Sequence, residues 1–371
     1  MLLLLPFDGS SQLKMVDKKA TKQTKNLYAN LKTMAKTGTM FGHQEDMAYG
    51  IGWFMEEGRS DVKESVGVYP AIHGWEMGHI RDDKNISSLP WENMRKWIVE
   101  VYKRGGINTI SWHYRNPVTN THSWDTTSAV KHILPGGDQH ESYLEALDIL
   151  AEYLKSLKSG STKIPIIWRP YHEHNGDWFW WGKGNCTEEE YIALWRFSVE
   201  YLRDKKKVHN LIYAFSPDRS RMSMSNLSQE YFYGYPGDEY VDIIGLDNYW
   251  DVGRLDNQEP IPSHITNFVK SLALVDSIAK AKNKVAALTE TGLESLSDSI
   301  WFTRHLLEPM SQIQNLELSW ILVWRNAHDI DNHFFAPYPG HASVEDFLKF
   351  RDEKNIYFES DLKNIYKKPT K

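Results

Sequence analysis

Eight short apolar runs recur along the chain, and each ends in polar or charged residues. The runs are rich in Ile, Val and aromatic side chains and occupy residues 39–46, 69–77, 107–117, 164–175, 211–218, 241–250, 285–292 and 318–327. Stretches such as IPII (164–167) and VAAL (285–288) are apolar without alternation, which is typical of strands buried on both faces. The pattern predicts eight strands of a parallel sheet.

Amphipathic stretches with helical spacing separate most of these runs. They cover residues 91–106, 141–160, 187–207, 265–283 and 297–313. The second of them has leucines at 144, 147, 150 and 154, in steps of three and four that predict a helix. Thr187, followed by three glutamates, has the pattern of a helix N-cap. Residues 78–90 are instead predicted to form a longer loop after the second strand.

Strands that alternate with helices indicate βαβ units. Eight units suit a closed (β/α)8 barrel better than an open, doubly wound sheet, and no G-x-G-x-x-G or P-loop motif supports the open sheet. A length of 371 residues fits one such barrel with long loops. We therefore expect a single α/β domain over residues 21–371.

Residues 1–20 are interpreted as a leader remnant or an extension added for expression. The apolar run in MLLLLPFDGS is too short to span a membrane and lacks a basic n-region and a cleavage site. No other stretch approaches a membrane span, so membrane insertion is not expected.

Composition narrows the possible partners and chemistry. The net charge of −6 argues against a nucleic-acid-binding surface, which needs clustered Lys and Arg. With one cysteine, Cys186, the chain has no intramolecular disulfide and no cysteine metal site. The sequence has no G-x-S-x-G elbow for a serine nucleophile, and Cys186 is interpreted as structural or incidental.

The candidate chemistry lies where the predicted strands end, because a barrel carries its active site at the C-terminal ends of its strands. Nearly every run ends in titratable or aromatic groups. They are His43, Glu45, His73, Glu76, His113, Arg115, Arg169, His172, Glu173, Asp218, Asp247, Tyr249, Glu290, Trp324 and Arg325.

Two of these carboxylates, Glu173 and Glu290, follow the fourth and the seventh strand. Those strands lie on opposite sides of a barrel mouth, so the two side chains can converge across it. Two facing carboxylates are the minimal apparatus for glycoside hydrolysis. The alternative for either residue alone is a structural ion pair, with Arg169 or Arg325 as the partner.

Tryptophans near the strand ends indicate a sugar substrate, because a flat ring covers the apolar face of a pyranose while polar groups hold its hydroxyls. The tryptophans at or just past predicted strand ends are Trp75, Trp112, Trp178, Trp180, Trp181, Trp250 and Trp324. Trp195 and Trp301 are instead expected to pack between helix and strand.

Two segments, HEH (172–174) and HDIDNH (328–333), have the residue types of metal ligands. Neither has the H-E-x-x-H spacing of a zinc protease, and the second lies in a loop where sugar-contacting groups are equally natural. We expect neither a catalytic metal nor a cofactor.

The segment RPYHEHNGDWFWWG (169–182) resembles the acid/base segment of glycoside hydrolase family 26, whose best-known members are endo-β-1,4-mannanases. The resemblance extends over almost the whole chain. Further segments follow in the family's order, namely GWEMGH (74–79), SWHYRNP (111–117), LDNYW (246–250), LTETG (288–292) and VWRNA (323–327). The family's fold is a (β/α)8 barrel, in agreement with the strand count, and its mechanism retains anomeric configuration.

The resemblance implies roles at the reacting centre. Glu173 is the expected acid/base and Glu290 the expected nucleophile. Tyr249 would hydrogen-bond the nucleophile, His172 would position the acid/base and the sugar, and Arg169 would support the active-site carboxylates.

The resemblance also implies substrate-binding residues. Trp324 would form the platform under the sugar that is cleaved, and His113 would contact the same region. Arg325 would reach a more distal unit on the non-reducing side, and Trp178 would stack on the leaving-group side.

By the same resemblance, the expected activity is that of a retaining β-1,4-mannanase acting on mannan polysaccharide or manno-oligosaccharides. Family members that cut β-1,3-xylan or mixed-linkage β-glucan remain alternatives, as does a non-catalytic carbohydrate-binding barrel. Endo action and mannobiose release both stay open, since long loops at 78–90, 116–137 and 326–343 decide between them. We expect an exported monomer.

Overall fold

The computed structural model describes residues 14–369, so most of the predicted N-terminal extension lies outside the described residues. Its last part packs on the domain. The backbone N–H of Val16 donates to the carboxylate of Asp242 at 2.8 Å, and Val16, Asp17 and Ala20 are buried.

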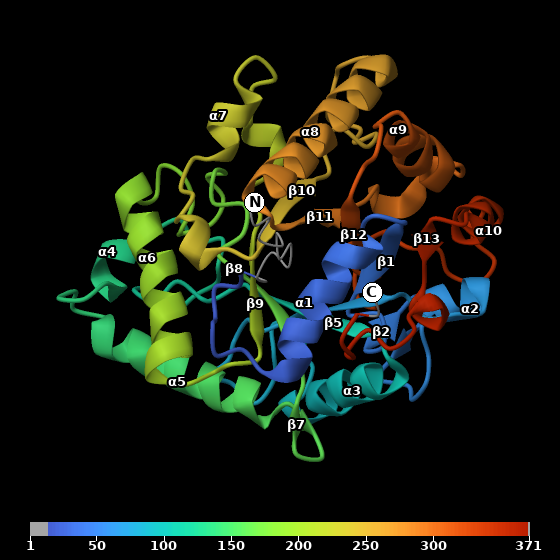
Figure 1. Ribbon diagram of the computed structural model, residues 1–371. Helices are drawn as coiled ribbons and strands as arrows, with labels where there is room; N and C mark the ends of the chain where they lie inside the picture. The colour runs from blue at the N-terminus through green and yellow to red at the C-terminus, as the bar shows by residue number, and fades with distance from the viewer. Residues whose placement is uncertain (1–13, 370–371) are drawn as a thin grey trace, which may run out of the picture.

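Eight parallel strands close into a barrel, which confirms the predicted (β/α)8 fold (Figure 1). Each strand pairs with the next along the chain, and β12 pairs with β1 to close the ring. The barrel strands are β1 (Thr39–Gln44), β4 (Ile72–Glu76), β5 (Ile107–Trp112), β8 (Ile166–Pro170), β9 (Leu211–Phe215), β10 (Ile243–Asn248), β11 (Val285–Thr291) and β12 (Leu318–Val323).

Helices surround the barrel, as Figure 1 shows. The α-helices are α1 (Lys22–Met34), α2 (Asp61–Val66), α3 (Trp91–Arg104), α4 (Val130–Ile133), α5 (His140–Ser156), α6 (Glu188–Glu200), α7 (Leu227–Tyr231), α8 (Ile261–Lys282), α9 (Glu308–Ser311) and α10 (Val344–Asp352). Two segments are π-helical, η1 (Tyr201–Lys205) and η5 (Phe302–Leu307). Four are 3₁₀ turns, η2 (Arg219–Arg221), η3 (Asp238–Tyr240), η4 (Glu294–Leu296) and η6 (Glu359–Asp361).

Three minor pieces of sheet complete the described elements. The hairpin β2 (Tyr49–Gly50) and β3 (Trp53–Phe54) follows β1, and the hairpin β6 (Lys158–Ser159) and β7 (Thr162–Lys163) precedes β8. The short strand β13 (Ile356–Tyr357) pairs with the start of β1.

The predicted helices agree with the structure, and two of them contain a π-helical segment. Thr187 caps α6 through a capping box with Glu190, as its sequence pattern predicts. Within the predicted stretch 187–207, α6 continues into η1, and within 297–313, η5 continues into α9 without a break. Within residues 14–369, no helix has both the length and the apolar composition needed to cross a bilayer.

The strands are buried on both faces, and alternate residues belong to two separate apolar clusters. Ile212 and Ala214 of β9 lie in the cluster inside the barrel, which Leu27, Tyr28 and Leu31 of α1 close at one end. Leu211, Tyr213 and Phe215 of the same strand lie in the outer cluster against the helices. Figure 1 shows α1 in the middle of the ring of helices, across the barrel. The other end of the barrel, where the strands finish, is open to the cleft described next.

Candidate active site

A cleft of about 940 Å³ opens at the carboxyl ends of the strands. Seven of the nine predicted site residues line it, namely His113, His172, Glu173, Trp178, Tyr249, Glu290 and Trp324. They come from the ends of β5, β8, β10, β11 and β12 or from the loops that follow. The barrel therefore brings together residues that lie more than 200 positions apart in the sequence.

Glu173 lies three residues beyond the end of β8, in a turn with unusual backbone angles. Tyr171 and Glu173 have φ values of 47° and 54°, in the left-handed region that non-glycine residues rarely adopt. The Glu173 N–H donates to the carbonyl of Ser216 at 2.8 Å, which ties the turn to the end of β9. Strained residues of this kind cluster at functional sites because the surrounding structure fixes them.

The carboxyl group of Glu173 is held by one side-chain donor. Trp178 Nε1 donates to Glu173 Oε2 at 2.8 Å. Burial raises the pKa of Glu173 well above its ordinary value, and the negative charges of Asp218, Glu290 and Asp247 raise it further. The surroundings of Glu173 therefore favour its protonated form, which can act as a general acid.

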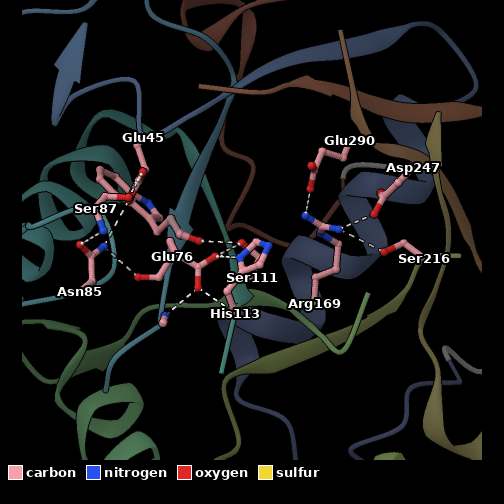
Figure 2. A network of polar contacts seen from close by, with 12 residues as sticks. Glu45, Glu76, Asn85, Ser87, Ser111, His113, Arg169, Ser216, Asp247 and Glu290 are labelled. Carbon is pink, nitrogen blue, oxygen red and sulfur yellow. Dashed lines mark hydrogen bonds and ion pairs between the residues drawn. The ribbon is translucent and has the colours of Figure 1, made fainter. Parts of the chain in front are cut away.

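Glu290 stands in the opposite electrostatic situation. Arg169 pairs with Glu290 Oε2, and the hydroxyl of Tyr249 donates to Glu290 Oε1 at 2.7 Å. Figure 2 shows the Arg169 guanidinium between Glu290 on one side and Asp247 and Ser216 on the other. Its distance to Asp247 Oδ2 is 2.6 Å. Both oxygens of Glu290 thus receive donors that stabilise the carboxylate and fix its orientation.

Arg169 itself is 3% exposed and lies beneath the cleft. Burial lowers the pKa of its guanidinium, but Asp247 and Glu290 outweigh that effect and keep it above its ordinary value. Thr289 donates to Asp247 Oδ1 at 2.7 Å, which fixes the aspartate that pairs with Arg169. The predicted supporting role of Arg169 agrees with these contacts.

Two histidine rings form the wall next to Glu173. The rings of His113 and His172 meet edge to face, with centroids 4.6 Å apart. Burial, together with the charge of Arg169, lowers the pKa of His172 well below its ordinary value, so its ring is neutral. His113 Nδ1 and its backbone N–H both lie 2.7 Å from the Glu76 carboxylate, as Figure 2 shows. Although burial raises the pKa of Glu76, the charge and hydrogen bonds of His113 bring it below its ordinary value, which keeps Glu76 as an acceptor.

Aromatic side chains cover several parts of the cleft. Trp178, Trp250 and Trp324 line it, as the sequence predicts, and Trp124 and Phe179 line it as well. Trp124 is 47% exposed and stacks on the ring of His113 at 5.2 Å. It lies in the middle of a loop, seven residues beyond the predicted third strand, which is why a search of strand ends misses it.

Four of the predicted sugar platforms are wrong, because Trp75, Trp112, Trp180 and Trp181 are fully buried. Trp75 and Trp112 lie in the outer cluster, and Trp75 stacks on Trp97 of α3 at 6.2 Å. Alternation explains this, because the next residue after Trp112, His113, lines the cleft, and the next residue after Trp75, Glu76, contacts His113. Trp195 and Trp301 are buried as predicted.

Trp180 and Trp181 instead fix the loop between β8 and α6 (residues 171–187) through their indole N–H groups. Trp180 Nε1 donates to the Tyr114 carbonyl at 2.8 Å, and Trp181 Nε1 donates to the His172 carbonyl at 2.9 Å.

Arg325 does not line the cleft. Its Nη1 lies 3.2 Å from the Tyr49 hydroxyl, and its guanidinium lies 5.8 Å from the centre of that ring. Tyr49 in turn donates to Glu45, which also accepts from Ser87 at 2.7 Å. Figure 2 shows Glu45, Ser87 and Asn85 grouped beside the Glu76–His113 pair. The structure thus places Arg325 in a polar cluster at the end of β1.

The two segments with metal-ligand residue types are dispersed. His174 Nε2 lies 2.6 Å from the Tyr233 carbonyl, and its ring stacks on Tyr191, away from Glu173. His333 lies at the rim of the cleft, with Nδ1 2.6 Å from Glu294. Among the residues that the structure describes, no three His, Cys, Asp or Glu side chains are grouped so that they could hold a metal ion.

Asp218 is the residue whose importance the sequence did not reveal. The sequence shows it only as a polar strand end, yet it lines the cleft and its charge is the one that contributes most to the raised pKa of Glu173. Asn175 fixes it by accepting from its N–H and donating to its carbonyl, both at 2.7 Å.

A (β/α)8 barrel whose mouth holds one carboxyl group with a raised pKa and one ion-paired carboxylate, in a cleft lined by tryptophans, has the site of a glycoside hydrolase. The chain belongs to glycosyl hydrolase family 26, because the model of that family matches residues 16–304. The resemblance inferred from the sequence motifs is thereby confirmed.

Two bacterial relatives are mannan endo-1,4-β-mannosidases. The chain is 36% identical, over 76% of its length, to a mannan endo-1,4-β-mannosidase of Bifidobacterium adolescentis. It is 29% identical, over 62% of its length, to another of Bacillus subtilis. These matches span 28% and 64% of the two relatives, so the chain corresponds to less than two thirds of either protein.

Solved structures agree over nearly the whole fold. A family 26 β-mannanase from Bacteroides ovatus superposes with a TM-score of 0.86 at 40% identity, covering 94% of this chain and 98% of that one. A modular endo-β-1,4-mannanase from Cellulomonas fimi superposes with a TM-score of 0.88 at 31% identity, covering 97% of this chain and 80% of the other.

Proposed function

We propose that this protein is a retaining β-1,4-mannanase that hydrolyses mannan, galactomannan or glucomannan. The observation that carries the proposal is the contrast between Glu173 and Glu290 in one cleft. The carboxyl group of Glu173 is surrounded by negative charge, and that of Glu290 is paired with Arg169. The names of the relatives, which act on β-1,4-linked mannan, support the substrate.

In the first step, Glu290 attacks the anomeric carbon while Glu173 transfers its proton to the departing glycosidic oxygen. Tyr249 and Arg169 hold the two oxygens of Glu290, so the attacking carboxylate is already oriented. The bond from the anomeric carbon to the leaving oxygen breaks as the bond to Glu290 forms.

In the second step, Glu173, now a carboxylate, removes a proton from water, and that water displaces Glu290 from the sugar. Two inversions give net retention. The site suits this switch, because the Trp178 N–H that bonds Glu173 stabilises the ionised form once the negative charge at Glu290 has been consumed.

Different aromatic and histidine side chains contact different sugar units of the substrate. We assign to Trp324 the sugar that is attacked, because its backbone N–H donates to the carbonyl of Thr291, the residue after Glu290. Trp178 bonds Glu173 and so lies on the leaving-group side. His113 and neutral His172 offer polar ring atoms to hydroxyl groups between them.

Purified protein incubated with mannan, galactomannan, xylan and lichenan, with products followed over time, tests the activity. We expect manno-oligosaccharides from the first two substrates. Early mannobiose alone would indicate release from chain ends, and a spread of oligomers would indicate internal cutting. Products from β-1,3-xylan or lichenan alone would replace this proposal with another specificity in the same family.

Proton NMR of the first product tests the mechanism separately. Retention requires the β-anomer at the newly formed reducing end before mutarotation. An initial α-anomer would contradict the double displacement while leaving the substrate assignment intact.

We further propose that the protein acts outside the cytoplasm as a monomer. A mannan polymer cannot cross a lipid bilayer, and every residue assigned a role in hydrolysis comes from one chain. Light scattering after size-exclusion chromatography tests the oligomeric state, and fractionation of the source cells tests the location.

A further inference from the structure

A second, smaller cavity of about 250 Å³ adjoins the cleft on the side of Glu173. Its walls come from the loop after β8 (Asn175 and Lys183), from the start of α6 (Glu188) and from residues 229–233 around α7. Arg221 lines both this side pocket and the cleft. The two cavities therefore share a wall.

The wall shared by the two cavities contacts the loop between β8 and α6, which carries Glu173. The Arg221 guanidinium lies 5.1 Å from the centre of the Trp178 ring, and Trp178 bonds Glu173. Asn175, on the side-pocket wall, holds Asp218 of the cleft through two hydrogen bonds. The side pocket thus lies beside the part of the cleft that Trp178 and Asp218 line.

The lining of the side pocket combines rings with balanced charge. Tyr233 and Phe232 supply flat apolar faces, and Lys183 Nζ lies 4.8 Å from the centre of the Tyr233 ring. Two cations, Lys183 and Arg221, line it together with two carboxylates, Glu188 and Glu230, and Arg221 also pairs with Asp177 at 2.7 Å. A phosphate site would show an excess of positive charge, and a cation site an excess of negative charge. Equal numbers of donors and acceptors beside rings suit a neutral ligand with many hydroxyl groups.

The polar groups of the side pocket are partly fixed in advance. Glu188 Oε1 accepts from the Gly234 N–H at 2.8 Å, and Glu230 Oε2 accepts from the Ser223 N–H at 2.7 Å. Anchoring one oxygen of each carboxylate reduces the conformational entropy lost on binding. The volume is below the roughly 300–1,000 Å³ typical of pockets for drug-sized ligands, which suits one monosaccharide unit.

We propose that the side pocket binds one neutral hexopyranosyl unit on the leaving-group side of the substrate, in contact with Tyr233 and Phe232 and held by Lys183, Glu230 and Arg221. This assignment rests on the proposed hydrolase function, because Glu173 defines the leaving-group side. The unit is either a further sugar of the main chain or a galactosyl branch, since both present the same ring face and hydroxyl groups.

Measurement of kcat/KM on three substrate sets distinguishes these sources. The sets are short linear manno-oligosaccharides that end before the side pocket, longer linear ones that reach it, and galactosyl-branched ones. For Tyr233→Ala we expect kcat/KM to fall about three- to tenfold on the substrates that fill the side pocket and to stay unchanged on the short linear ones. A loss confined to long linear substrates identifies a main-chain unit, and a loss confined to branched substrates identifies a galactosyl branch.

Lys183→Ala provides a second variant, because Lys183 is exposed and its removal leaves the packing intact. We expect kcat/KM to fall on the same substrates as for Tyr233→Ala, but by a smaller factor. Tyr240→Ala is the matched control, since Tyr240 is also half-buried with an arginine, Arg196, 5.2 Å from its ring centre. Tyr240 precedes β10 and so lies at the opposite end of the barrel from the cleft.

Equal kcat/KM in wild type and both variants on all three sets would overturn the assignment, and so would equal losses on every set. A wild-type protein that is inactive on every mannan would overturn the proposed function as well. The two failures are therefore distinguishable.

Discussion

The two carboxyl groups of the cleft differ in what surrounds them more than in where they lie. Both residues line the same cavity, where Glu290 is buried and Glu173 is half-buried. Glu290 is met by a guanidinium and a phenol. Glu173 receives one indole N–H and faces three other carboxylates. Their different chemistry therefore comes from their neighbours.

The difference follows from which strands contribute those neighbours. Arg169 precedes Glu173 by four residues on β8, yet its side chain extends across the barrel to β10 and β11, where it meets Asp247 and Glu290. The acid therefore follows closely after the strand that carries the cation but receives none of its hydrogen bonds among the described contacts. One arginine, directed inward, makes the two carboxyl groups unequal.

The largest effect is expected from Glu290→Ala, which removes the nucleophile. Turnover on mannan should fall by on the order of 10⁴-fold or more, as for loss of a group that the other catalytic residues depend on. Oligosaccharide binding, measured by calorimetry, should persist because the rings and histidines stay in place. Glu294→Gln is the control, as Glu294 lies at the rim of the same cleft and is exposed. Near-normal turnover in Glu290→Ala would refute its assignment.

Glu173→Ala should reduce turnover on mannan by roughly 10²- to 10⁴-fold, the usual contribution of a general acid and base. A substrate with an aryl leaving group of low pKa needs no proton, so its first step should survive. Added azide should then accelerate turnover and give a β-glycosyl azide, because it attacks the intermediate on Glu290. In Glu290→Ala, azide would attack the substrate directly and give the α-azide. The same anomer from both variants would show that the roles have been misassigned.

Tyr249→Phe should have an intermediate effect, because it removes one of the two donors to Glu290 and leaves Arg169 in place. A hydrogen bond to a charged group contributes about 1.5–3 kcal/mol, so kcat should fall by about ten- to a hundredfold. KM should change little if the bond matters mainly for orientation of the nucleophile. Tyr338→Phe, a half-buried tyrosine absent from the cleft lining, serves as control. A raised KM with unchanged kcat would instead show that Tyr249 binds substrate uniformly.

Much of the fold and the central pair could be predicted from the sequence. Runs such as VAAL and the capping box at Thr187 depend on local composition, which the sequence displays directly. Glu173 and Glu290 could be found because a barrel brings all strand ends to one face.

The sequence does not show which tryptophans reach the cleft. A strand that is buried on both faces has no polar–apolar alternation to distinguish residues that face the barrel axis from residues that face the helices. Trp112 and His113 are neighbours, and only the structure shows that Trp112 turns to the helices. The role of Asp218 depends on a distance between two loops, which no local pattern encodes. The same holds for Trp124 and for the position of Arg325 against Tyr49.

The smallest and most specific effect is expected from Asp218→Asn, which tests why Glu173 differs from Glu290. After burial, the charge of Asp218 is the leading cause that raises the pKa of Glu173. An ionised neighbour favours the protonated acid, so removing that charge lowers the pKa of Glu173. The alkaline limb of kcat/KM reports deprotonation of the acid in the free enzyme, and it should therefore move to lower pH. The acid limb should not move in step, because Asp218 makes no described contact with Glu290.

Asparagine keeps the side-chain oxygen that caps the η2 turn, so the variant changes charge with little change in shape. Asp177→Asn is the matched control, because Asp177 is exposed and pairs with Arg221 at 2.7 Å near the same loop. Its removal should leave the alkaline limb in place. An alkaline limb that stays fixed in Asp218→Asn, or that moves to higher pH, would mean that Asp218 does not help to keep Glu173 protonated. The contrast between the two carboxyl groups would then rest on burial, on the charges of Glu290 and Asp247, and on Arg169.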